Sequence, residues 1–239
     1  TDQAVFDSWL SRLEAAPLFA FDTETTSLNY MQAEIVGLSF AIKPGEAAYV
    51  PLAHLNPGLG GQLDRDRILD QMKPLLESDA VKKVGQHLKY DANVLANHGI
   101  TLRGIAHDTM LQSYIIDAVG SRHDMGSLAL KYLGQRVISF EEVAGKGAKQ
   151  VSFDHVDIEQ AAAYAAEDAD VTLRLHETLM SKLEAEASLN EVYQRLELPL
   201  VPVLSKIERN GAYVSTDKLR AQSHEIAIRL AELESQACE

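Results

Sequence analysis

Four acidic side chains and one tyrosine lie in three segments of the chain where, brought together, they could bind divalent cations. They are Asp22, Glu24, Asp91, Tyr164 and Asp168. Carboxylate oxygens are hard ligands that suit Mg²⁺ or Mn²⁺. Two such cations about 4 Å apart stabilise both the entering and the leaving oxygen of an in-line displacement. The chemistry that these residue types favour is therefore hydrolysis of a phosphodiester bond.

The first two carboxylates lie on a predicted strand. The apolar run Leu-Phe-Ala-Phe at residues 18–21 is typical of a buried strand. Because side chains alternate along a strand, Asp22 and Glu24 point to the same side, together with the small Ala20. Two carboxylates on one face repel each other unless a cation lies between them.

Asp91 follows a second predicted strand, at residues 81–86. Residue 87 opens a helix that should stop near Gly99, a residue that favours helix C-termini. In α/β sheets, sites gather at the carboxyl ends of strands, so we expect Asp91 at such an edge. The segments that follow residue 100 are predicted to be mostly helical.

Tyr164 and Asp168 lie on an alanine-rich segment that predicts a helix from Ile158 to about Lys182. Residues four apart share one helical face. A phenol and a carboxylate could then contact the same water or cation.

Four further acids near these motifs have structural explanations. Glu167 and Asp170 flank Asp168 but point to other faces of the same helix. Asp108 and Asp124 stand where helices begin and are predicted to be N-caps. We therefore leave all four out of the candidate site.

Three short motifs carry a resemblance to a known family. The stretches FDTET (21–25), LKYD (88–91) and YAAEDAD (164–170) resemble the exonuclease motifs of the 3′→5′ proofreading domain of bacterial DNA polymerase I, in the tyrosine branch of the DEDD exonucleases. The resemblance covers nearly the whole chain. It implies the ribonuclease-H-like fold, which agrees with the α/β mixed sheet flanked by helices that the order of predicted strands and helices favours.

The resemblance also implies a role for each residue. Asp22 would bridge two divalent cations, Glu24 and Asp168 would complete the shell of one, and Asp91 would hold the second through water. Tyr164, with Glu24, would orient the attacking water. Mg²⁺ or Mn²⁺ is implied, with Zn²⁺ possible in one position.

The resemblance extends to residues that would contact a single-stranded or frayed 3′ end of DNA. Leu28 and Phe140 would wedge against the terminal bases, although an apolar residue is more often simply packed in a core. Residues that could meet phosphates are Gln86, Lys89, Tyr90 and Arg122. For Arg122 a solvated surface charge is an equal alternative.

One position departs from the family pattern. The second motif usually opens with asparagine, and here His87 stands there. Imidazole can donate a hydrogen bond as an amide does, but it is bulkier and can titrate near neutral pH. The positioning of the strand end or the pH profile could therefore differ from the family's, without loss of a metal ligand.

The composition and net charge of the chain indicate what it can bind and in which compartment it works. Its net charge of −13 is unusual for a protein that binds nucleic acid. We expect weak DNA binding by the chain alone, with a larger basic domain of the same full-length protein holding the duplex. The single cysteine, Cys238, fits a reducing cytoplasm. No apolar run is long enough to span a bilayer. We also expect the protein to be a monomer.

The chain changes character near residue 189. We predict an exonuclease domain at residues 1–188 and the truncated start of a polymerase domain at residues 189–239, because two late helices carry apolar stripes without a core of their own. The alternative is a pair of helices that closes the first domain.

Two rival functions remain open from the sequence. A ribonuclease-D-like exoribonuclease would use the same catalytic residues on RNA. A catalytically silent spacer that supports a polymerase is also compatible with the fold, although such a protein would have no need of all four carboxylates.

Overall fold

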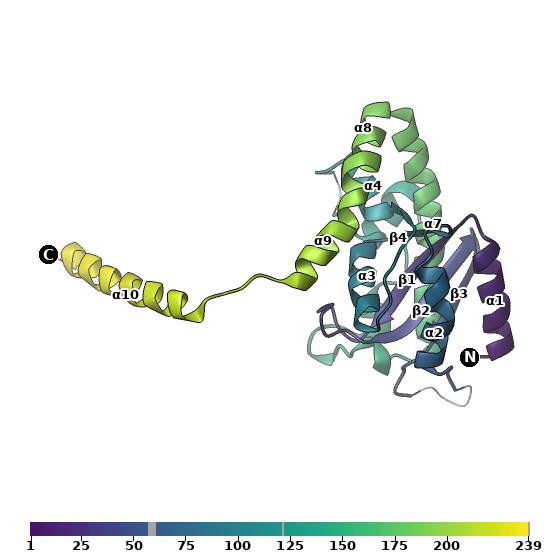
Figure 1. Ribbon diagram of the computed structural model, residues 1–239, viewed down its shortest axis with the longest axis horizontal. Helices are drawn as coiled ribbons and strands as arrows, with labels where there is room; N and C mark the ends of the chain where they lie inside the picture. Colours follow the sequence, from purple (N-terminus) through teal and green to yellow (C-terminus); the bar gives the residue numbers. More distant parts are fainter. Residues whose placement is uncertain (57–60, 121, 239) are drawn as a thin grey trace. The chain divides into compact units, whose positions relative to one another are not determined.

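The computed structural model describes residues 1–56, 61–120 and 122–238 (Figure 1). The strands are β1 (Leu18–Thr25), β2 (Ile35–Lys43), β3 (Glu46–Pro51), β4 (Lys82–Gly85) and β5 (Ile105–Asp108). The helices up to β5 and just after it are α1 (Gln3–Ala15), α2 (Arg65–Leu76), α3 (Leu88–Asn97), α4 (Thr109–Ile116) and α5 (Met125–Leu128). The later helical segments are η1 (Ala129–Leu133), α6 (Phe140–Ala144), η2 (Gly147–Lys149), η3 (Phe153–His155), α7 (Ile158–Ala185), α8 (Ala187–Val192), η4 (Tyr193–Glu197), α9 (Leu198–Asn210) and α10 (Thr216–Cys238).

The five strands form one mixed sheet in the order β3-β2-β1-β4-β5. The pairs β1–β2 and β2–β3 are antiparallel, whereas β1–β4 and β4–β5 are parallel. This confirms the predicted mixed α/β sheet and its ribonuclease-H-like class. The segments after residue 100 are mostly helical, as predicted; they also include β5, an edge strand of four residues that is too short to show a period of two.

The two faces of the sheet are covered by different helices. Phe19 and Phe21 of β1 point into a large apolar core shared with α1, α2 and α3. On the opposite face α7 packs across β1, β2 and β3. There three small side chains, Ala20, Ala41 and Ala169, lie at the contact together with Val84 and Leu173. Because the three alanines are small, the axis of α7 comes close enough for its polar side chains to reach those of β1.

The chain divides into two compact units, Thr1–Lys206 and Ile207–Glu239. The first therefore extends beyond residue 188 and includes α8, η4 and the start of α9. In the second, α10 has no buried residue, and its assignment to a polymerase domain stays a prediction. Within residues 1–56, 61–120 and 122–238, no helix is both long and apolar enough to cross a lipid bilayer.

Candidate active site

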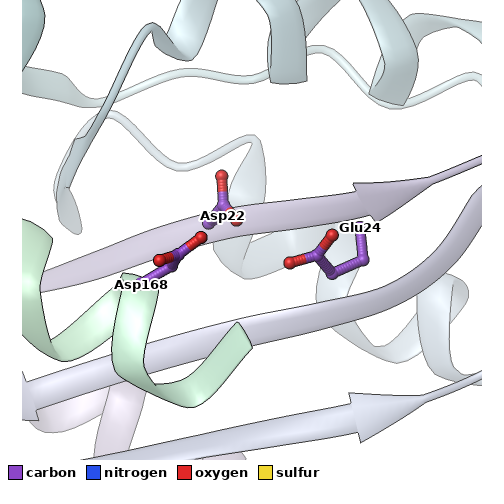
Figure 2. A group of neighbouring side chains, drawn as sticks. All are labelled: Asp22, Glu24 and Asp168. Carbon is purple, nitrogen blue, oxygen red and sulfur yellow. The ribbon is translucent and has the colours of Figure 1, made fainter. Parts of the chain in front are cut away.

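Three of the four predicted carboxylates meet between β1 and α7. Asp22 and Glu24 leave β1 on the side that faces α7, and Asp168 reaches toward them from that helix (Figure 2). One carboxylate oxygen from each lies within 4.8 Å of the others. Glu24 and Asp168 are buried and Asp22 is part-buried. The alternation of side chains along β1 and the close packing of α7 against the sheet together bring these three carboxylates into proximity.

Asp91 lies beside β1, on α3, and is fixed by Thr23. Asp91 accepts hydrogen bonds from the Thr23 amide at 3.0 Å and from the Thr23 hydroxyl at 2.6 Å. Its side chain is 2% exposed and it lies in the first turn of α3, as predicted. It is not one of the three mutually close carboxylates, yet its charge still acts on Glu24.

The tight turn from β4 into α3 places Asp91 there. A Cβ on Gly85 would lie 2.9 Å from the carbonyl oxygen of Phe21, so only glycine lets β4 end this close to β1. His87 then adopts a left-handed conformation, with φ 64° and ψ 45°. Asparagine and histidine are among the few side chains that enter this region readily. The requirement at position 87 is thus conformational, and His87 meets it.

The carboxylates raise one another's pKa. Burial, followed by the charge of Asp168, raises the pKa of Asp22 to about 8. Burial also raises the pKa of Asp168 to about 7, against a hydrogen bond from Tyr164 that lowers it. The pKa values of Glu24 and Asp91 are raised well above the usual range by burial and by the neighbouring carboxylates. Without a counter-charge the group resists full ionisation at neutral pH.

These residues fit divalent cations. Oε1 of Glu24 is buried and has no hydrogen-bond partner among the described residues. A buried carboxylate oxygen without a donor is costly, and a hard cation would satisfy it while offsetting the repulsion between the three carboxylates.

The raised pKa values predict how the metal-free protein responds to pH. A folded-state pKa above the unfolded value means that folding takes up protons, so stability is present at low pH and lost as pH rises. We expect the free energy of unfolding in EDTA to fall steadily as pH rises from 4 to 8. Urea denaturation across this range measures it, and an excess of Mn²⁺ should remove most of the fall. A flat profile in EDTA would contradict the described electrostatics.

Tyr164 lies one helical turn before Asp168, at the edge of a cleft of about 480 Å³ that both residues line. Its ring packs against the buried ring of Phe153 and the edge of Phe140, with centroids 5.8 and 6.5 Å apart. Burial and the neighbouring carboxylates raise its pKa far above the usual range, so the hydroxyl keeps its proton, which it donates to Asp168. The sequence prediction that it shares a face with Asp168 is confirmed.

The two predicted wedge residues are both accessible. Leu28 follows β1 and is 93% exposed, and Phe140 is 38% exposed and lines the cleft. Ordinary core packing therefore does not explain Leu28. Tyr90 holds the loop of Leu28, because its hydroxyl donates to the Ser27 carbonyl at 2.6 Å and pairs with the Thr25 hydroxyl.

The remaining predicted contacts differ in their surroundings. The Gln86 amide donates to the His123 carbonyl at 2.8 Å and accepts from the Thr109 hydroxyl. Lys89 lines a separate, smaller pocket of about 80 Å³ beside α9. Arg122 is highly exposed and pairs with Asp124 at 3.4 Å. Contact of these residues with a substrate stays a prediction.

The acids that we left out have the structural roles expected of them. Asp108 caps α4 and Asp124 caps α5. Asp170 accepts from the Gly45 amide and Glu167 from the Ile138 amide, on other faces of α7. The partner that sequence reasoning missed is Thr23, whose position between Asp22 and Glu24 was the available signal.

Comparisons with known proteins show the family to which this chain belongs. Residues 1–184 match a family model described as 3′-5′ exonuclease. DNA polymerase I of Pseudomonas aeruginosa is 61% identical over 99% of this chain, and that of Rhizobium leguminosarum is 46% identical over 98%. The chain spans 26% and 25% of the lengths of these relatives.

Solved structures show the same fold. A structure described as the POL domain of Pol1 from M. smegmatis, in complex with DNA primer-template and dNTP, superposes with a TM-score of 0.76 and 21% identity. The match covers 97% of this chain and 35% of that one. We conclude that the chain belongs to the 3′-5′ exonuclease family and is a hydrolytic exonuclease domain of the kind found in DNA polymerase I.

Proposed function

We propose that this domain removes nucleotides from the frayed 3′ ends of DNA and releases 5′-mononucleotides, with two divalent cations, Mg²⁺ or Mn²⁺, at Asp22, Glu24, Asp91 and Asp168. The observation that carries the proposal is the group of three carboxylate oxygens within 4.8 Å, one residue of which, Glu24, has a buried oxygen without a donor. Bound cations would supply charge neutralisation at the phosphate and a water that loses its proton near neutral pH.

Each site residue of the chain has its own role in the proposed reaction. Asp22, Glu24 and Asp168 would form the inner ligand group, and Asp91, held by Thr23, would contribute from outside that group. Tyr164, whose hydroxyl is hydrogen-bonded to Asp168, would orient the attacking water together with Glu24. Leu28 and Phe140 lie on exposed edges where their side chains can stack against terminal bases, which favours unpaired ends of any sequence.

The polymerase domain of the same full-length chain is the proposed partner. A net charge of −13 gives this domain little attraction for a duplex. Its relatives are DNA polymerase I chains about four times as long, and in such a protein another domain could hold the duplex and deliver a melted end. Proofreading of freshly copied DNA would follow from this arrangement.

The test supplies labelled DNA with a mismatched or a fully paired 3′ end, in Mg²⁺ or Mn²⁺, and follows release of 5′-mononucleotides by chromatography. We expect faster release from the mismatched end and loss of release in EDTA. An Asp168→Asn variant, purified in parallel, controls for contaminating nucleases.

Two outcomes would replace the proposal. Faster hydrolysis of a matched RNA end than of the DNA end would favour the exoribonuclease alternative. Equal rates from wild type and Asp168→Asn, with no paired Mn²⁺ binding by calorimetry, would favour the silent spacer.

A further inference from the structure

One wall of the cleft has no regular secondary structure. Residues 136–140, here called the cleft wall, connect η1 to the start of α6 and line the cleft opposite Tyr164 and Asp168. The wall carries Phe140, so its position determines where that ring lies relative to the carboxylates. Residues 136–139 lie outside any helix or strand and Phe140 begins α6, so other contacts must hold the segment before Phe140 in place.

Glu167 supplies such a contact from α7. Its Oε2 accepts a hydrogen bond from the backbone amide of Ile138 at 2.7 Å, and its Oε1 accepts one from Gln135 Nε2 at 3.3 Å. Both donors lie in or next to the cleft wall. A carboxylate that accepts from a backbone amide makes a charge-assisted and directional bond.

The same polar face of α7 continues the network. Arg174 donates to Gln135 Oε1 at 2.7 Å and to Asp170 Oδ2 at 3.3 Å. Asp170 Oδ1 in turn accepts from the Gly45 amide at 2.6 Å, in the turn between β2 and β3. The cleft wall and the sheet are therefore both bonded to the helix that presents Asp168.

Apolar packing alone would leave the register of the wall loosely defined. Val137 and Leu133 pack against a cluster that includes Val171 and Leu175 of α7, and such contacts are non-directional. The bond to Ile138 is directional, and Glu167 is the residue directly before Asp168. Any shift of the cleft wall along α7 would break the hydrogen bond between the Ile138 amide and Glu167.

We propose that Glu167 is a positioning residue, which fixes the wall that carries Phe140 at a set distance from the carboxylates and so determines how well a 3′ end is held. The proposal rests on the proposed function for its effect on substrate. The bond itself can be tested without any substrate.

The experiment compares Glu167→Ala with Glu167→Gln. Both remove the same negative charge beside Asp168, but glutamine keeps an oxygen that can accept from Ile138. On a single-stranded DNA oligonucleotide we expect alanine to raise KM about 10-fold with kcat within about 3-fold, and glutamine to stay within about 3-fold of wild type in both. Glu177→Ala, an exposed acid on the same helix, controls for loss of a charge from α7.

Three results would overturn the proposal. One is an alanine variant that matches wild type, and another is a glutamine variant as impaired as alanine, which would assign the effect to charge. The third is unchanged hydrogen exchange of the Ile138 amide in Glu167→Ala, because that amide should exchange faster when its acceptor is lost. The exchange measurement also separates this proposal from the proposed function, since a folded chain without nuclease activity would still report on the bond.

Discussion

Replacing Asp22 with asparagine is expected to lower turnover on the order of 10⁴-fold and, in the same protein, to raise the stability of the metal-free fold. The loss follows because the charge of Asp22 interacts with those of both Asp168 and Asp91, so Asp22 is the residue that would help to hold both proposed cations. Removing such a ligand should cost several kcal/mol of transition-state stabilisation, which corresponds to a rate loss of this size.

The gain in stability has the same origin. Burial and the charge of Asp168 raise the pKa of Asp22 to about 8, so ionised Asp22 opposes folding when no cation is bound. Asparagine has nearly the same shape and no charge. At pH 8 in EDTA we expect Tm to rise by about 3–6 °C, since 1 kcal/mol shifts a domain of this size by about 2–4 °C.

The measurement combines single-turnover kinetics with thermal unfolding in EDTA. Asp117→Asn, at an exposed acid that pairs with Lys131 away from the cleft, is the matched control and should gain no stability. A variant that is inactive and also less stable than wild type would show that Asp22 is a structural residue, and the electrostatic account of the site would then be wrong.

Asp108→Ala is expected to destabilise the protein by about 3–4 kcal/mol, the largest stability loss that we predict. The buried carboxylate of Asp108 accepts from four backbone amides: those of His87, Leu88, Met110 and Leu111. It therefore caps α3 and α4 at once. Loss of a single cap typically costs about 1 kcal/mol, and each buried amide left without an acceptor adds to that.

Urea denaturation of Asp108→Ala, Asp108→Asn and Asp124→Ala measures the effect. Asparagine keeps one strong acceptor and should lose about half as much. Asp124 accepts from one backbone amide of a short helix and is more exposed, so its alanine variant should lose only about 1 kcal/mol. Equal losses of unfolding free energy in Asp108→Ala and Asp124→Ala would mean that capping two helices stabilises the protein no more than capping one.

The site could be predicted in part because its geometry is local. A period of two along β1 places Asp22 and Glu24 on one face, and a spacing of four along α7 places Tyr164 and Asp168 on one face. Caps are also local, which is why the N-cap roles of Asp108 and Asp124 could be predicted. Short-range rules of this kind depend only on neighbours in the chain.

Other features depend on contacts between distant segments, and sequence patterns do not encode these directly. The strand β5 is too short to show a pattern, and it forms because its backbone pairs with β4. The bond between Thr23 and Asp91 joins residues 68 positions apart. His87 departs from the usual asparagine of the second motif, and its left-handed backbone conformation explains why histidine is accepted at this position.

The amino-acid sequence by itself determined which residues carry the chemistry and which face of its own strand or helix each one occupies. Only the tertiary structure decided that three carboxylates meet while the fourth lies outside this group, because that outcome depends on how closely α7 approaches the sheet over Ala20, Ala41 and Ala169. It also decided the role of Glu167, whose partner Ile138 lies in a segment that sequence patterns leave unassigned. Secondary structure follows from periodicity, whereas the distance between two elements follows from the sizes of the side chains packed between them.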